Sequence, residues 1–125
     1  MVSPLIVQRL IALPFLVLGS WCLFWPRMVL ELGLNPEYRQ LTATTILLMG
    51  CFGSQAVLSG LFAWFSSFTR TTFLVYGIAL LPFFWFNYWF VFEEPVFSQW
   101  MALDFISNAA MLSLCVWGWR ISRVG

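Results

Sequence analysis

The segment TTFLVYGIALLPFFWFNYWFVF at positions 71–92 contains no charged residue and is long enough to cross a bilayer as a helix. A helix rises ~1.5 Å per residue, so ~20 apolar residues span the ~30 Å hydrocarbon core. Three more apolar segments of similar length occupy residues 5–25, 41–65 and 98–119. None of them alternates apolar and polar residues as a barrel strand does. The sequence therefore predicts an all-α integral membrane protein, a bundle of four transmembrane helices forming a single domain over residues 1–125.

The composition agrees with a membrane protein and excludes several function classes. Of 125 residues, 62% are hydrophobic and only 9% are charged, whereas a soluble domain carries about 25% charged residues. The chain has no His and no Lys, which excludes His-based general bases, His metal ligation, Lys Schiff bases and Walker-type phosphate loops. A net charge of +1 cannot support nucleic-acid binding. We therefore predict no metal site, no catalytic residue and no nucleic-acid partner.

The loops and their arginines predict the topology. Residues 27–40 form a short interfacial helix and turn, in which Gly33 stops the helix and Asn35-Pro36 begins the turn. Two arginines lie in this connection, and four lie on the side of the termini: Arg9, Arg70, Arg120 and Arg123. This bias favours cytoplasmic termini in a bacterial inner membrane or a eukaryotic endomembrane, with dual insertion as the alternative.

Small residues in the second span suggest close helix packing. The pairs Gly50-x-x-x-Ser54 and Ala56-x-x-x-Gly60 are each spaced by four residues, which allows another backbone to approach. We expect this helix to lie at the centre of the bundle, and a self-association seam is the alternative.

The three cysteines have positions that prevent pairing. Cys22, Cys51 and Cys115 fall at different depths, and no Cys-x-x-Cys motif is present. We expect three unpaired thiols, which excludes a quinone-linked thiol oxidoreductase.

Asp104 is the polar residue that most needs an explanation. It lies about 9 Å into the fourth span by helix rise, where a carboxylate costs on the order of 2.5–3.5 kcal/mol. Ser107 and Asn108 follow at i+3 and i+4, on the same helix face. Asn87 reaches a similar depth on the third span, and we predict that it hydrogen-bonds to Asp104. Thr45 on the second span is a further candidate for this polar layer.

The polar layer has two interpretations. It could fix helix register as interhelical hydrogen bonding, or it could bind a ligand or proton. The third span adds eight aromatic residues between Phe83 and Phe92, which either pack against lipid and helices or form a wall for a flat lipophile such as a quinone, sterol, carotenoid or other pigment. The candidate ligand-binding residues are Asp104, Asn108, Asn87, Ser107, Tyr88 and Trp85. No haem is expected.

Several motifs in the first half are similar to the DoxX-like group of small four-helix membrane proteins. They are Arg9, Gly19 and Pro26, then Leu32-Gly33-Leu34, then the glycines Gly50 and Gly53. The resemblance implies the four-helix fold. That group includes subunits of quinone-linked oxidoreductases, but the motifs identify no functional residue.

Three function classes follow from these patterns. The first is a non-catalytic subunit or assembly factor of a larger membrane complex, because the loops are short and catalytic side chains are few. The second is a small carrier or lipophile-binding protein that holds a lipid, quinone or carotenoid at the polar layer. The least favoured is a lipid-modifying enzyme, because Asp104 has no second titrating group.

Overall fold

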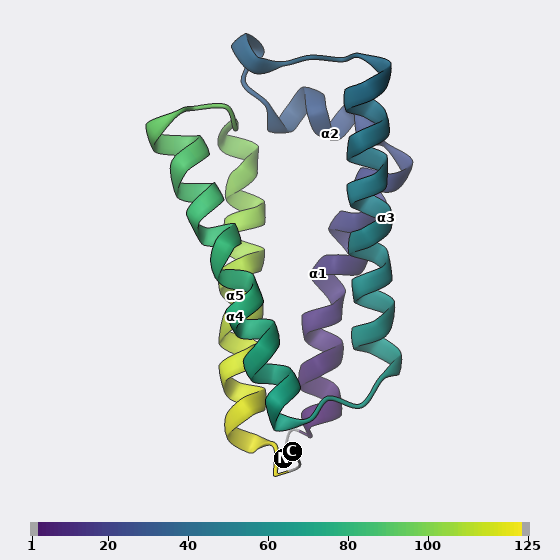
Figure 1. Ribbon diagram of the computed structural model, residues 1–125, viewed down its shortest axis with the longest axis vertical. Coiled ribbons are helices and arrows are strands. Elements are labelled where there is room, and N and C mark those ends of the chain that lie inside the picture. The colour runs from purple at the N-terminus through teal and green to yellow at the C-terminus, as the bar shows by residue number, and fades with distance from the viewer. Residues whose placement is uncertain (1–2, 124–125) are drawn as a thin grey trace.

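The computed structural model describes residues 3–123 and has the expected all-α architecture (Figure 1). Four long helices and one short one build it: α1 (Pro4–Phe24), α2 (Pro26–Gly33), α3 (Ala43–Phe65), α4 (Arg70–Tyr88) and α5 (Ala102–Ile121). Three single turns connect them: η1 (Pro36–Tyr38), η2 (Trp89–Glu93) and η3 (Gln99–Met101). Four segments are long and apolar enough to span a membrane: Pro4–Phe24, Ala43–Phe65, Arg70–Glu93 and Gln99–Ile121.

Local capping explains where the helices begin. Thr42 and Thr45 form a reciprocal capping box at the start of α3, and Thr69 and Thr72 form another at the start of α4. Thr45 also donates to the Gln40 carbonyl at 2.5 Å, so it caps α3 and takes no part in the polar layer expected for it. The four orphan N–H groups at each helix start are therefore partly satisfied by the chain itself.

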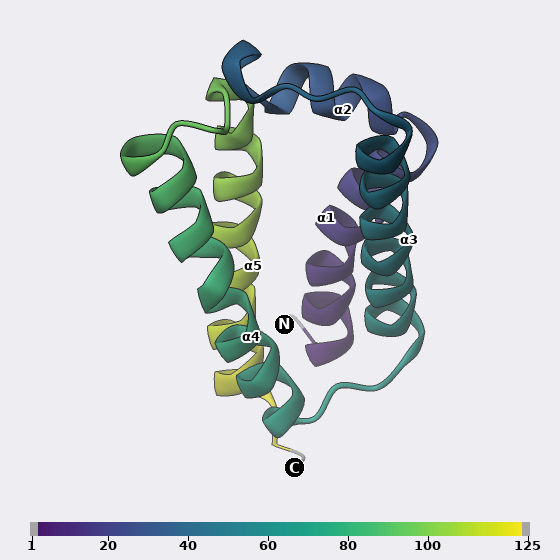
Figure 2. The same ribbon diagram turned by 45° about the horizontal axis from the view of Figure 1, so that its top comes forward.

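The long helices form two pairs, α1 with α3 and α4 with α5. We call the end where α1 begins and α5 finishes the terminal end, and the opposite end, crossed by α2, the α2 end (Figures 1 and 2). In both views the pairs converge toward the terminal end and diverge toward the α2 end. α1 also packs against α5, whereas α3 packs mainly on α1 and α2. The expectation that residues 41–65 form the central helix is therefore wrong, and α1 is central.

Glycines bring α1 and α3 into very close contact. A Cβ atom at Gly53 would lie 2.4 Å from the Leu23 nitrogen, and one at Gly60 would lie 2.8 Å from the Leu16 side chain. Ala56 lies in the same seam, where a Cβ at Gly19 would meet its side chain at 2.9 Å. Ala56 and Gly60 thus take part in close helix packing, as their spacing predicts.

Gly50 and Ser54 lie outside the seam. A Cβ at Gly50 would have no neighbour within 4 Å, and Ser54 is exposed. The prediction that Gly50 and Ser54 take part in packing within the bundle is therefore wrong. Gly53 has this role instead, because only one face of α3 can meet α1. Their role in self-association stays a prediction.

The packed core occupies the terminal half of the bundle. It includes the fully buried side chains of Val7, Ile11 and Phe73, with Met111 and Cys115 from α5. Gln8 is only 1% exposed and joins α1 to the α3–α4 connection. It donates to the carbonyls of Ala63 at 2.8 Å and Ser66 at 2.6 Å, and accepts from the Phe68 nitrogen at 2.8 Å. The apolar core and the hydrogen bonds of Gln8 together close this end of the bundle.

A backbone latch closes the α2 end. Leu34 and Phe97 form an antiparallel bridge, flanked by hydrogen bonds from the Asn35 nitrogen to the Val96 carbonyl and from the Ser98 nitrogen to the Gly33 carbonyl, both 2.8 Å. The Asn35 side chain donates to the carbonyls of Pro95 at 2.6 Å and Phe97 at 3.1 Å. The latch thus ties the connection after α2 to the α4–α5 loop.

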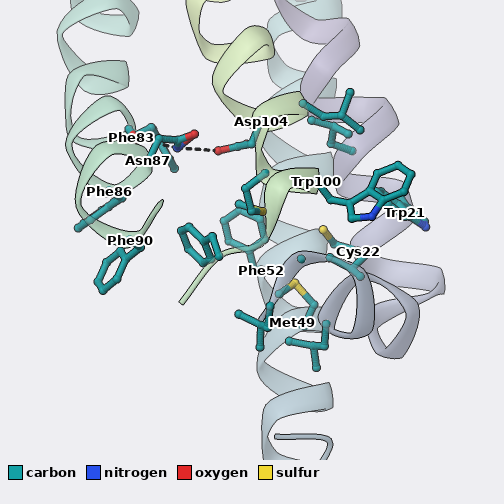
Figure 3. Close-up of a pocket in the computed structure, with 18 residues that line it drawn as sticks. Trp21, Cys22, Met49, Phe52, Phe83, Phe86, Asn87, Phe90, Trp100 and Asp104 are labelled. Atoms are coloured by element: carbon teal, nitrogen blue, oxygen red, sulfur yellow. Dashed lines mark hydrogen bonds between the residues drawn. The ribbon is translucent and has the colours of Figure 1, made fainter. Parts of the chain in front are cut away.

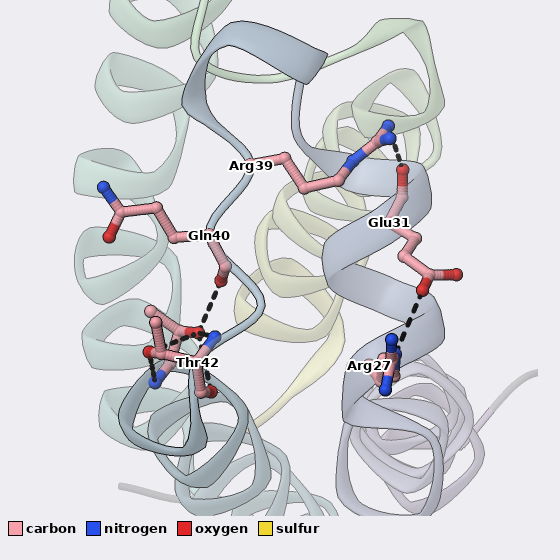
Figure 4. A network of polar contacts seen from close by, with 6 residues as sticks. Arg27, Glu31, Arg39, Gln40 and Thr42 are labelled. Carbon is pink, nitrogen blue, oxygen red and sulfur yellow. Dashed lines mark hydrogen bonds and ion pairs between the residues drawn. The ribbon is translucent and has the colours of Figure 1, made fainter.

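Contacts of charged side chains stabilise α2 and connect it to the loop that follows (Figure 4). Arg27 pairs with Glu31 at 3.2 Å, and Arg39 donates to the Glu31 carbonyl at 2.6 Å. The expected short helix of residues 27–40 is therefore α2 followed by the turn η1, with Gly33 ending α2 as predicted.

Candidate functional site

The divergent helix pairs line a partly open cavity of about 460 Å³ beneath α2 (Figure 3). Ligand pockets are ~300–1,000 Å³, so this volume can hold a small molecule. Its wall is almost entirely apolar, with seven aromatic side chains from α1, α3, the α4–η2 segment and the region before α5: Trp21, Phe52, Phe83, Phe86, Phe90, Phe97 and Trp100. Asn87 and Asp104 are the two residues with polar amide or carboxyl groups in the lining.

Asp104 and Asn87 make the hydrogen bond predicted from the sequence. The Asn87 Nδ2 donates to Asp104 Oδ2 at 3.0 Å, across the α4–α5 pair. Asn108 Nδ2 donates to the same oxygen at 3.2 Å. Asn87 is 5% exposed and Asn108 is 3% exposed. The three side chains therefore form one buried polar group, which we call the Asp104 group.

The Asp104 group leaves an acceptor without a donor. Asn87 Nδ2 also donates to the Phe83 carbonyl at 2.8 Å. Both neighbours of this nitrogen are oxygens, which fixes the orientation of the amide. The Asn87 Oδ1 atom is then buried without a hydrogen-bond partner among residues 3–123. A buried acceptor without a donor lowers the stability of the folded protein.

Helix α5 begins at Ala102, four residues later than the sequence suggested, and follows directly on the helical turn η3. Asp104 lies in the first turn of α5. In the described part of the chain, Asp104 has no ion pair with an arginine.

A second, smaller cavity of about 210 Å³ adjoins the first. Leu18, Phe52, Phe83 and Asp104 line both cavities, and Asn108 lines the smaller one. Asp104 therefore lies where the two spaces meet, and its carboxyl group is accessible to a molecule that occupies either.

The remaining predicted site residues lie outside the larger cavity. Trp85 and Tyr88 point away from it and are 59% and 50% exposed. Trp85 stacks on Trp89 at 5.6 Å, and Tyr88 donates to Glu93 Oε1 at 3.2 Å. Ser107 is half-buried on α5 and lines neither cavity. Trp85 and Tyr88 thus belong to the lipid-facing side of the aromatic segment.

Several cavity residues were not identified from the sequence. Trp21 and Trp100, at the ends of their spans, both line the cavity. Phe52 contributes from α3 between the two spaces. Their side chains are common in membrane helices and at interfaces, so composition alone gives no signal for a cavity.

The site offers no metal or disulfide chemistry within the described range. Across residues 3–123, no cluster of three His, Cys, Asp or Glu side chains could hold a metal ion. Cys22, Cys51 and Cys115 are free, as expected, although Cys51 is exposed rather than buried. The chemistry of the site is therefore the acceptor chemistry of the Asp104 group in an apolar space.

Comparison with known proteins does not assign the site. The chain matches no family model, no curated protein and no solved structure.

Proposed function

We propose that this protein binds one lipophilic small molecule, with an apolar body in the larger cavity and a polar end at the Asp104 group. The observation that carries the proposal is an apolar space of about 460 Å³ with Asp104 and Asn87 at one side. Small-molecule sites commonly combine an apolar wall with a few convergent polar groups that set orientation.

Interhelical hydrogen bonding alone accounts less well for the Asp104 group. A pair that only fixes helix register works best when all its polar atoms are satisfied. Here Asn87 Oδ1 is left unpaired, and the Asp104 carboxyl group lies where two cavities meet. A ligand that donates to this carboxyl group explains why the polar group adjoins an open space.

Cavity filling tests the proposal. Val29 lies in the cavity roof on α2, whereas Val75 is 55% exposed on the outer face of α4. The protein is extracted gently from its native membrane, and copurifying small molecules are identified by native mass spectrometry and organic extraction. We expect one lipophile per chain in the wild type and in Val75→Trp, and its loss in Val29→Trp. Equal retention by both variants, or no lipophile in the wild type, contradicts the proposal.

A non-catalytic role in a larger membrane complex is the second candidate. It is favoured by the small residues Gly50, which has no neighbour within 4 Å of an added Cβ, and Ser54, which is exposed, because a helix backbone can approach closely at such positions. The DoxX-like resemblance stays a prediction that fits this role. The same extraction tests it: polypeptides that copurify at fixed stoichiometry support a subunit, and a lone chain contradicts it.

Cytoplasmic termini are part of the proposal. The even number of spans places both termini on one side, and the arginine bias favours the cytoplasm. In this orientation the cavity lies in the half of the bilayer away from the cytoplasm.

A further inference from the structure

We propose that the polar end of the bound molecule is an ammonium group, so that the natural ligand is a lipophilic amine. This inference rests on the proposed function and narrows its ligand class. The ammonium donates to the carboxyl group of Asp104, with its apolar body among the aromatic side chains of the larger cavity.

Hydrogen-bond accounting requires a donor from the ligand. Both N–H groups of Asn87 are used, by Phe83 and by Asp104 Oδ2. Both hydrogen bonds described for the Asp104 carboxyl group go to Oδ2, so Oδ1 is available to a ligand where the two cavities meet. A ketone or ester would bring another acceptor to a place that already lacks donors. An ammonium brings up to three donors and no acceptor.

The charge balance of the site points in the same direction. A carboxylate within a membrane span is normally paired or faces a cavity. The arginines of the described chain are bound elsewhere or lie at the ends of the bundle, with Arg27 and Arg39 at α2 and Arg9 and Arg70 at the terminal end, each over a tryptophan. A positive charge that complements an ionised Asp104 therefore comes from outside the described chain. A neutral hydroxyl would satisfy the hydrogen bonds but not the charge.

Aromatic rings provide the third element of a cation site. Phe83, Phe86 and Phe90 line the cavity from the α4–η2 segment, together with Phe52 from α3. The negative face of an aromatic ring attracts an organic cation, and this attraction is stronger where water is excluded. Asp104 and the rings thus combine a charge partner with a compatible apolar surface.

Three probes with one tail length separate charge from hydrogen bonding: dodecylamine, 1-dodecanol and 2-dodecanone. Each is titrated into the full-length protein in nanodiscs of zwitterionic phosphatidylcholine, and occupancy is measured by native mass spectrometry. We expect one amine per chain, at least ten-fold tighter than the alcohol, with the ketone weakest. Asp104→Asn should reduce the preference for the amine to less than two-fold, whereas the matched change Glu94→Gln, at an exposed loop position, should not.

Asn87→Leu is a second variant in case Asp104→Asn does not fold. It removes the amide N–H that donates to Asp104 Oδ2 and favours its carboxylate form, and it should weaken dodecylamine binding several-fold. Equal binding of amine and alcohol by the wild type, or an amine preference that survives Asp104→Asn, would overturn the amine inference while the proposed lipophile site stands. Failure of all three probes together with an unaffected Val29→Trp variant would overturn both.

The ammonium could belong to a phospholipid headgroup or to a free amine, and the nanodisc lipid distinguishes them. Replacing part of the phosphatidylcholine with phosphatidylethanolamine adds a primary amine headgroup without changing the tail chemistry. Competition with dodecylamine then identifies an amine-headed phospholipid as the occupant, and undiminished dodecylamine binding identifies a free amine.

Discussion

Substitution of Gly53 by Ala tests whether the α1–α3 seam is set by backbone contact. The new Cβ atom would lie 2.4 Å from the Leu23 nitrogen, 2.7 Å from the Gly19 oxygen and 2.8 Å from the Cys22 carbonyl carbon. All three are backbone atoms of α1, so no side-chain rotation relieves the overlap. Ordinary contact begins at 3.4 Å, and the helices must therefore separate locally by about 1 Å.

This separation has a calculable cost. A gap of ~0.5–1 Å already forfeits a quarter to a half of the dispersion energy of each affected contact, and overpacking in a closely packed interior costs about 1–3 kcal/mol. Because the obstructing atoms are backbone, we place Gly53→Ala in the upper half of that range, about 2–3 kcal/mol. Removing a helical glycine gains up to ~1 kcal/mol of helix propensity, which offsets part of the loss.

Gly50→Ala is the matched control, because it makes the same change on the same helix with no neighbour within 4 Å. The propensity gain cancels between the two variants, so Gly53→Ala should be less stable than Gly50→Ala by about 2–3 kcal/mol. The free energy of unfolding is measured by reversible denaturation with sodium dodecyl sulfate in mixed micelles, followed by far-ultraviolet circular dichroism. Equal stabilities would refute the close seam.

Three further predictions address the two ends of the bundle. Gln8→Leu should lower the free energy of unfolding by about 2 kcal/mol, because a buried donor left unpaired costs ~1–3 kcal/mol; the same detergent denaturation measures it. Asn35→Ala should speed labelling of Cys22, which lines the cavity, by a lipophilic maleimide several-fold, because the latch loses two side-chain hydrogen bonds. In intact cells, a membrane-impermeant maleimide should label Glu37→Cys but not Ser3→Cys, as cytoplasmic termini require.

Each of these measurements has a result that contradicts it. Gln40→Leu changes an exposed glutamine and should leave the free energy of unfolding unchanged. A similar loss of stability in both variants would show that the buried hydrogen bonds of Gln8 do not stabilise the fold. Labelling of Cys22 requires Cys51→Ser and Cys115→Ser in the background, and an unchanged rate would show that the latch does not control access. Labelling of Ser3→Cys from outside would invert the topology.

The helices could be read from the sequence because the bilayer allows few alternatives. Four segments of suitable length and the absence of alternation leave only a helical bundle, and the observed spans agree with the expected ones within a few residues. The hydrogen bond between Asn87 and Asp104 could also be predicted, because the short α4–α5 loop places both residues at one depth on adjacent helices. Depth follows from counting residues along a span, and the rise per residue is constant.

The direction in which a residue faces could not be read in the same way. Gly50 and Gly53 are equivalent as sequence, yet only Gly53 meets α1. Trp85 and Phe86 are neighbours in an aromatic segment, yet only Phe86 lines the cavity. Lipid and protein interior are both apolar, so a membrane helix needs no polar face toward its surroundings, and hydrophobic periodicity gives no orientation.

The placement of the cavity follows from what fills each half of the bundle. At the terminal end, Ala12 and Phe73 are fully buried, and Gly118 lies directly against the Phe73 ring. Toward the α2 end, Phe52 and Phe83 stand between the helix pairs, and α2 with its latch covers the space without filling it. A molecule that reaches Asp104 therefore cannot enter through the packed terminal end. Its path is between the divergent pairs or past the latch. The latch contacts between residues 33–35 and 96–98, which hold α2 against the α4–α5 loop, therefore control entry by the second path.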